Sequence, residues 1–229
     1  MNDTLVIPKI FFQTSKVKLD PYVVDLIKRN LNTGWEYFHF VDSEIIQFFT
    51  DNPDPEFPNI IDLFNKIILG QHKADFFRYY FLYKKGGVFI DSDVMIYQNI
   101  DTIINNNSFF TVLSNAICDG QKTIFQGIIG CYPKHPFIYK ALKNFYNMDL
   151  SLLDIRYKWQ NYLRITKDFY NIINTNESQS SYTLYNETFI PEHRYFNITN
   201  NDNLLLFKHF YAITEILNKE FLDLHKPSV

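Results

Sequence analysis

The 229-residue sequence has few cysteines and glycines, no basic block and no long apolar run. Only Cys118 and Cys131 are present, so a disulfide framework is excluded and two free thiols in a reducing compartment are expected. The formal net charge of −3 argues against nucleic acid as the main partner, because affinity for a phosphate backbone needs clustered Lys and Arg. A nucleotide ligand remains compatible with this charge, since a divalent cation can neutralise its phosphates.

No apolar run reaches the roughly 18 residues that cross a bilayer. A strand-like segment begins at residues 5–8 without a signal-peptide pattern before it, so a cytoplasmic chain with no transmembrane segment is expected. Hydrophobic residues make up 46% of the chain, which is enough for a buried core. We interpret most of the 23 Phe and 16 Tyr as members of that core and not as ligand-binding surfaces.

Strand-like and helical patterns alternate along the chain, which predicts an α/β fold in a single domain over residues 1–229. Strands are expected at residues 7–14, 35–41, 87–90, 109–113, 127–131, 189–196 and 204–207. Helices are expected at residues 21–30, 42–49, 60–68, 71–85, 136–147, 152–169 and 214–224. Polar loops are expected at residues 52–58, around Asp119-Gly120 and at residues 171–181.

The triplet Asp91-Ser92-Asp93 follows the short apolar strand at residues 87–90. An Asp-x-Asp triplet alone is typical of a solvated turn, but ligands of α/β sheets bind where such strands end. In extended backbone Asp91 and Asp93 point to the same side while Ser92 faces away. Two converging carboxylates repel each other unless a cation lies between them. The triplet therefore predicts a site for a hard divalent cation and a phosphate group.

The helix before this strand carries a second polar pair, Asp75 and Arg78, which lie three residues apart and share a helical face. An isolated pair of this kind is usually a surface ion pair of small energetic value. Here the helix ends at Gly86-Gly87 and leads directly into the acidic strand end, so the pair is expected at the same site. The aspartate can accept hydrogen bonds from sugar hydroxyls, and the arginine can contact a sugar or a diphosphate.

Three segments together resemble a known family. They are residues 73–93 (KADFFRYYFLYKKGGVFIDSD), residues 7–14 (IPKIFFQT) and residues 126–137 (QGIIGCYPKHPF). The sequence is similar to the DXD-containing sugar transferases, the family of the yeast initiating α-1,6-mannosyltransferases and capsular polysaccharide transferases, and distantly to the clostridial glucosylating toxins. It departs from the family at Phe12, where histidine is usual, and at Gln126, where asparagine is usual.

The resemblance covers roughly residues 5–145 and implies a GT-A type fold, with a mixed, mostly parallel sheet flanked by helices. It also implies a nucleotide-diphosphate sugar donor, Mn²⁺ or Mg²⁺, a glycan or other acceptor, and retention of the anomeric configuration. Residues 1–100 would form the nucleotide-sugar half of the domain and residues 101–229 the acceptor half. We favour a UDP-sugar as donor, with GDP-mannose as the alternative.

Carried over to this sequence, the resemblance makes Asp93 the direct metal ligand and gives Asp91 contacts to ribose and metal. Asp75 and Arg78 would hold the donor sugar, and Gln126 would lie beside the transferred sugar or the acceptor. Asp91, Asp93, Arg78 and Gln126 form the expected catalytic set. The expected donor-binding set is Gln13, Thr14, Ala74, Asp75, Arg78, Asp91 and Ser92, with Gln13 and Thr14 near the nucleobase.

A further metal ligand is expected from the C-terminal region, where the family often supplies a histidine. His209, in the segment Phe207-Lys208-His209-Phe210-Tyr211, is the candidate. His193 is interpreted as a loop residue, and His72 and His135 as helix-start and turn residues near the site.

Three other functions share parts of this pattern. A glycoside hydrolase uses paired carboxylates, but two residues on one strand are badly placed to flank a glycosidic bond from opposite faces. A sugar nucleotidyltransferase shares the metal and the nucleotide, and would release pyrophosphate. A catalytically degenerate sugar-binding module is compatible with the departures at Phe12 and Gln126, although Asp75, Arg78, Asp91 and Asp93 argue against it.

Overall fold

The structure is a computed structural model that describes residues 6–105, 107–153, 158–175 and 180–210. Its strands are β1 (Ile10–Thr14), β2 (Glu36–Phe40), β3 (Gly87–Ile90), β4 (Val94–Ile96), β5 (Phe109–Cys118), β6 (Gln121–Cys131), β7 (Thr183–Ile190), β8 (Tyr195–Thr199) and β9 (Leu205–His209). Its helices are α1 (Pro21–Asn30), α2 (Asp42–Asp51), α3 (Ile60–Lys66), α4 (Gly70–Lys85), α5 (Ile100–Asn105), α6 (Pro136–Tyr146) and α7 (Lys158–Thr175), with a short 3-10 helix at Leu150–Leu153.

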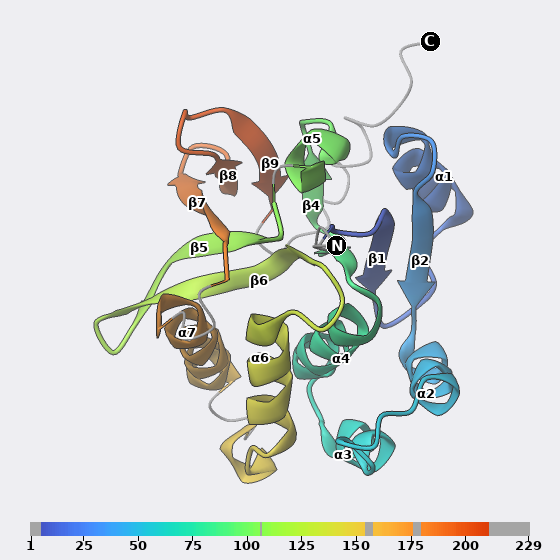
Figure 1. Ribbon diagram of the computed structural model, residues 1–229. Coiled ribbons are helices and arrows are strands. Elements are labelled where there is room, and N and C mark those ends of the chain that lie inside the picture. The colour runs from blue at the N-terminus through green and yellow to red at the C-terminus, as the bar shows by residue number, and fades with distance from the viewer. Residues whose placement is uncertain (1–5, 106, 154–157, 176–179, 211–229) are drawn as a thin grey trace.

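The strands of the described residues form one sheet in the order β2-β1-β3-β6-β5-β7-β8-β9-β4 (Figure 1). The expected mixed sheet flanked by helices is confirmed. Antiparallel pairs outnumber parallel ones by five to three, so the sheet has less parallel pairing than expected. The reason is local, since tight turns join β5 to β6 and β7 to β8, and a short connection makes its two strands antiparallel.

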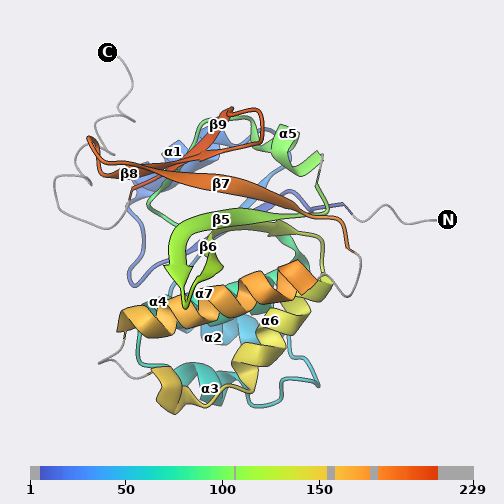
Figure 2. The same ribbon diagram turned by 90° about the vertical axis from the view of Figure 1, so that its left-hand side faces the viewer.

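Two buried clusters cover the two faces of the sheet. The larger one packs the sheet against α2, α3, α4, α6 and α7, and the smaller one includes residues of α1 and α5 (Figure 2). Val88 and Ile90 of β3 join the smaller cluster while Phe89 joins the larger, as the alternation of a strand requires. None of the described helices combines the length and apolarity needed to cross a membrane.

Phe12 belongs to the larger cluster. It stands where the resembled family has histidine, and it is fully buried with its ring centroid 4.0 Å from that of Phe81. The departure from the family is therefore accommodated as core packing.

The turn between α4 and β3 requires glycine. Gly86 and Gly87 have φ angles of 68° and 98°, a backbone conformation that residues other than glycine rarely adopt. A Cβ atom at Gly87 would lie 2.6 Å from the carbonyl oxygen of Ile10. The turn thus brings the start of β3 tightly against β1 and places Asp91 at the carboxyl end of β3.

Several expected elements need correction. The expected strand over residues 189–196 is wrong, because β7 ends at Ile190 and β8 begins at Tyr195. Pro191 begins the turn between them, and a proline cannot donate a hydrogen bond to a continuing strand. The helix expected at 152–169 is displaced, since α7 continues to Thr175 and occupies part of the expected loop 171–181.

Other expected elements were incomplete. The strands at 109–113 and 127–131 are parts of the longer β5–β6 hairpin, and β4 and α5 were not expected. The helix expected at 214–224 lies outside the described residues.

Candidate functional site

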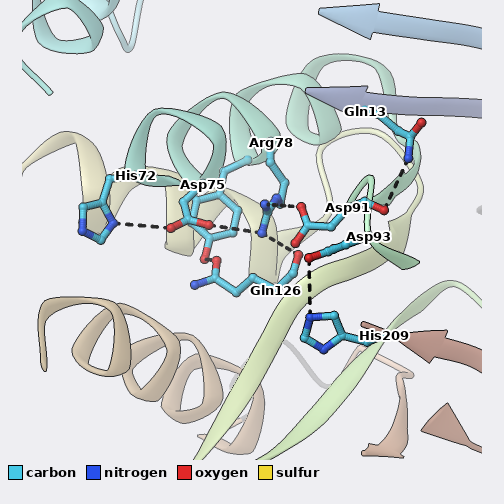
Figure 3. Close-up of polar contacts among 9 residues, drawn as sticks. Gln13, His72, Asp75, Arg78, Asp91, Asp93, Gln126 and His209 are labelled. Carbon is cyan, nitrogen blue, oxygen red and sulfur yellow. Dashed lines mark hydrogen bonds and ion pairs between the residues drawn. The ribbon is translucent and has the colours of Figure 1, made fainter. Parts of the chain in front are cut away.

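The triplet Asp91-Ser92-Asp93 connects β3 to β4 at the surface (Figure 3). The backbone N–H of Asp91 donates to the Gly127 carbonyl of β6 at 2.8 Å, and the N–H of Phe210 donates to the Asp93 carbonyl at 2.9 Å. Both carboxylates are partly exposed, and Ser92 is exposed. The triplet is therefore held by backbone contacts from two later strands while its carboxylates stay accessible.

Arg78 joins the carboxylates of α4 and β3. Its Nη1 lies 3.1 Å from Asp75 Oδ1 and donates to the Gln126 carbonyl at 2.5 Å, while its Nη2 lies 3.2 Å from Asp91 Oδ1. The guanidinium also lies over the Phe89 ring, 4.0 Å from its centroid. Only 4% of the Arg78 side chain is exposed, so the arginine fixes its neighbours more than it reaches toward solvent.

A buried group of polar atoms lies beside this ion pair, around Asp75 (Figure 3). His72 Nδ1 is 3.5 Å from Asp75 Oδ2, and Tyr79 Oη donates to Gln126 Oε1. Within the described residues, both ring nitrogens of His72, Asp75 Oδ2 and Gln126 Nε2 are buried without a hydrogen-bond partner. Buried polar groups of native proteins nearly always have partners, so water or ligand hydroxyls are expected to satisfy these atoms.

His209 lies on β9, the strand that pairs with β4, and faces Asp93. Its Nε2 lies 3.9 Å from Asp93 Oδ2, and its Nδ1 lies 3.2 Å from Glu187 Oε1. Burial opposes the charged form of the ring, but the hydrogen bond to Glu187 and the charge of Asp93 outweigh it and raise the pKa of His209. β9 therefore brings the candidate histidine close to the triplet.

The environment of the triplet disfavours the charged form of both of its carboxylates. Although 43% of the Asp93 side chain is exposed, desolvation by the surrounding protein raises the pKa of Asp93 to about 6, with a further contribution from the charge of Asp91. Burial also raises the pKa of Asp91, although Arg78 opposes the shift. A divalent cation between the carboxylates would remove this conflict, because it stabilises both in their charged form.

The donor set fits a metal ion. Carboxylate oxygens are ligands that Mn²⁺ and Mg²⁺ accept, and Asp93 Oδ1 is buried without a hydrogen-bond partner among the described residues. No three His, Cys, Asp or Glu side chains of the described ranges are already gathered as a metal cage. Phosphate oxygens and water would therefore have to complete the coordination shell.

The remaining expected residues lie around this centre in different environments. Gln13 is buried, and its amide donates to the Asp91 carbonyl at 3.4 Å while accepting from Tyr37 Oη at 3.0 Å. Gln13 therefore ties β1 and β2 to the triplet, and its amide is already engaged. Thr14 ends β1 and is half-buried, and Ala74 is half-buried on α4.

The other histidines lie where the sequence indicated. His193 is in the exposed turn after β7, and His135 is the buried N-cap residue of α6. His72 is fully buried on α4 next to Asp75.

Sequence reasoning missed three residues of the site: Glu187, Phe125 and Tyr79. Glu187 contacts His209, Phe125 stacks on the same ring with centroids 4.1 Å apart, and Tyr79 holds Gln126. An acidic residue inside a strand of mostly uncharged residues was the only available signal for Glu187. Tyr79 continues the helical face of Asp75 and Arg78, whereas Phe125 had no signal in a chain so rich in Phe and Tyr.

Comparisons with known proteins point to one family. Residues 19–110 match the family described as the glycosyltransferase sugar-binding region containing a DXD motif, a segment that holds Asp75, Arg78 and the triplet. An uncharacterized glycosyltransferase of Acanthamoeba polyphaga mimivirus is 29% identical over 118 residues, which cover 51% of this chain and 44% of that protein.

Two fungal proteins are also similar to part of the chain. Inositol phosphoceramide mannosyltransferase 1 of Schizosaccharomyces pombe is 27% identical over 48% of this chain and 32% of its own length. Mannosyl phosphorylinositol ceramide synthase SUR1 of Saccharomyces cerevisiae is 27% identical over 63% of this chain and 36% of its own length. The aligned segments cover less than half of each of these relatives.

Among solved structures, the PaToxG glycosyltransferase superposes with a TM-score of 0.46 and 12% sequence identity, over 76% of each chain.

Proposed function

We propose that this chain, a member of the DXD-containing glycosyltransferase family, moves a sugar from a nucleotide-diphosphate sugar to an acceptor hydroxyl with the help of a divalent metal ion. The observation that carries the proposal is the position of Arg78. It lies between Asp75 and Asp91, 3.1 and 3.2 Å from their carboxylates, and so joins the expected sugar-binding pair to the expected diphosphate anchor.

The metal would be held by Asp91 and Asp93, with His209 as a third protein ligand. When bound, Mn²⁺ or Mg²⁺ supplies positive charge to the diphosphate that leaves. Arg78 keeps Asp91 in place through the Nη2 contact at 3.2 Å. Charges that are fixed before the reaction need no reorganisation when the leaving group develops its charge.

The donor sugar would lie against the buried polar group of α4 and β6. Asp75 Oδ2 can accept a hydrogen bond from a sugar hydroxyl, and Gln126 Nε2 can donate one, since neither has such a partner among the described residues. Tyr79 keeps the Gln126 amide oriented by donating to its Oε1. Gln126 would lie beside the transferred sugar or the acceptor, as the family resemblance implies.

We propose retention of the anomeric configuration by attack of the acceptor on the face from which the diphosphate leaves. Proton NMR of the first product tests this step. A product with inverted configuration would contradict it, without affecting the assignment of the donor site.

The proposed donor is a nucleotide-diphosphate sugar, and the proposal leaves its nucleotide and its sugar to experiment. A UDP-sugar is the donor that we favour, whereas the names of two fungal relatives refer to mannose. UDP-glucose, UDP-galactose, UDP-N-acetylglucosamine and GDP-mannose therefore form the panel to be tested.

The test is release of nucleoside diphosphate by the purified chain, measured across this panel with Mn²⁺ and with EDTA. We expect one donor to give Mn²⁺-dependent release, and Asp93→Asn to reduce it at least about 100-fold, because metal stabilisation of the leaving group contributes several kcal/mol. Asp202→Asn, which changes an exposed carboxylate in the turn before β9, is the matched control and keeps the activity. Full activity of Asp93→Asn, or release of pyrophosphate in place of nucleoside diphosphate, contradicts the proposal.

A further inference from the structure

Glu187 lies on β7 and belongs to none of the motifs that the sequence offers. Its side chain is only 4% exposed. Its Oε2 accepts hydrogen bonds from Ser114 Oγ and from the backbone N–H of Asn115, both at 3.0 Å. Its Oε1 lies 3.2 Å from His209 Nδ1. The carboxylate is therefore fixed by β5 on one side and presents its second oxygen to the histidine of β9.

The ring of His209 packs nearly parallel to two phenylalanine rings. Phe125 stacks on it with centroids 4.1 Å apart and an interplanar angle of 24°, and Phe196 lies at 5.6 Å and 20°. These contacts fix the plane of the ring, while Glu187 fixes its rotation within that plane. The edge opposite Glu187 then points to the triplet, with Nε2 at 3.9 Å from Asp93 Oδ2 (Figure 3).

We propose that Glu187 is a positioning residue that sets the tautomer of His209. An ionised carboxylate can only accept a hydrogen bond, so the Nδ1 atom that faces it must carry the proton. The neutral ring then has its lone pair on Nε2, directed to the place where the proposed function puts the divalent cation. Histidine ligands of metals commonly have such a carboxylate partner on their other nitrogen, which fixes the ring and increases its basicity.

This inference rests on the proposed function for the identity of the ligand, but the orientation of His209 can be tested without it. Glu187 could otherwise serve only to hold β5, β7 and β9 together. A substitution of the same shape separates the two roles, because it leaves the packing intact and changes only which atoms donate.

Glu187→Gln makes a defined prediction. The Asn115 N–H and the Ser114 hydroxyl are donors, so they retain the amide oxygen on their side. The amide NH₂ then faces His209 and donates to Nδ1, and the proton of the neutral ring must move to Nε2. In that tautomer the edge of the ring that faces Asp93 carries a hydrogen and has no lone pair for a cation.

Nitrogen-15 NMR of the metal-free protein at about pH 9 reads the tautomer directly, with His209→Asn used to assign the signals. We expect the proton on Nδ1 in the unmodified protein and on Nε2 in Glu187→Gln. Glu192→Gln, in the exposed turn after β7, is the matched control and keeps the proton on Nδ1. A proton on Nε2 in the unmodified protein, or no change in Glu187→Gln, overturns the inference. Circular dichroism confirms that each variant is folded, and if Glu187→Gln is not, the position of the proton in the unmodified protein still decides the inference.

Titration with Mn²⁺ alone, followed by electron paramagnetic resonance, measures the consequence for the metal. We expect Glu187→Gln to weaken Mn²⁺ binding about 10- to 100-fold, as observed when a partner of a metal ligand is lost, and Glu192→Gln to leave it unchanged. Equal affinity of Glu187→Gln and the unmodified protein overturns the role toward the metal. Absence of Mn²⁺ binding by the unmodified protein contradicts the metal in the proposed function, and the NMR result then decides the role of Glu187 by itself.

Discussion

At the scale of single residues, Arg78 connects two acidic side chains of the site. It is 4% exposed and lies within 3.2 Å of the carboxylates of Asp75 and Asp91 as well as donating to the Gln126 carbonyl. Burying such groups costs free energy that only good partners offset. Removing the arginine would leave the buried Asp75 carboxylate without its counter-charge, which is much more costly than losing a surface pair.

We therefore expect Arg78→Met to lower the free energy of unfolding by about 3–5 kcal/mol, and Arg78→Lys to lower it less because the charge remains. Lys18→Met is the control. It removes an ion pair with Glu44 in which both side chains are well exposed, and such pairs contribute at most about 1 kcal/mol. Urea unfolding of the three variants measures the difference. Equal losses for Arg78→Met and Lys18→Met would mean that Arg78 is not the centre of the site.

At the scale of elements, the start of α6 contains a titratable cap. His135 is the N-cap residue, and its Nδ1 accepts the backbone N–H of Phe137 at 3.2 Å. The ring is fully buried against Phe109 and Tyr132, and burial lowers the pKa of His135 to about 3. The folded protein thus keeps this histidine neutral at pH values where an unfolded chain protonates it.

The sign of the pH dependence follows from that difference. Below about pH 6.5 the unfolded state binds a proton that the folded state does not. The free energy of unfolding therefore falls by about 1.4 kcal/mol for each unit by which the pH is lowered. Asparagine is also a favoured N-cap residue and has no such titration. Between pH 7 and pH 5, we expect the free energy of unfolding of His135→Asn to fall by about 2 kcal/mol less than that of the unmodified protein, as measured by urea unfolding. His193→Asn, in an exposed turn, keeps the pH dependence of the unmodified protein; the same slope in His135→Asn would contradict the assignment.

The sequence predicts best those helices and strands whose ends are determined by residues close to them in the chain. The helices α1 and α4 and the strand β3 have their caps, prolines and glycines within a few residues, and they were predicted nearly to the residue. The β7–β8 hairpin was missed because the apolar pairs Phe189-Ile190 and Tyr195-Phe196 were interpreted as one strand, although the polar turn at residues 191–194 separates them. The site follows the same division. Asp75, Arg78 and the triplet lie in one continuous motif, whereas Glu187 enters only through the order of strands in the sheet.

At the scale of the whole molecule, the site is assembled from elements in the middle of the chain and from the last described strand. α4 and β3 supply Asp75, Arg78 and the triplet, β6 supplies Gln126, and β9 supplies His209. The pairing of β4 with β9 aligns Val94 with His209. Because only the triplet separates β4 from β3, this pairing brings β9 close to the central strand β3. A ligand that contacts all these residues would therefore connect the proposed donor and acceptor halves.

This arrangement predicts how ligands change thermal stability. A nucleoside diphosphate bound with Mn²⁺ at about 100 times its Kd contributes about 2.7 kcal/mol, which corresponds to an increase in Tm of roughly 5–10 °C for a chain of this size. We expect UDP or GDP with Mn²⁺ to give this increase, and EDTA to remove most of it. Asp93→Asn and His209→Asn should each lose the increase in Tm that depends on Mn²⁺, although the two residues lie far apart in the sequence. Asp202→Asn should keep this increase. A shift that is the same with EDTA as with Mn²⁺ would show that the nucleotide binds without the metal, and a loss in Asp93→Asn alone would separate β9 from the metal site.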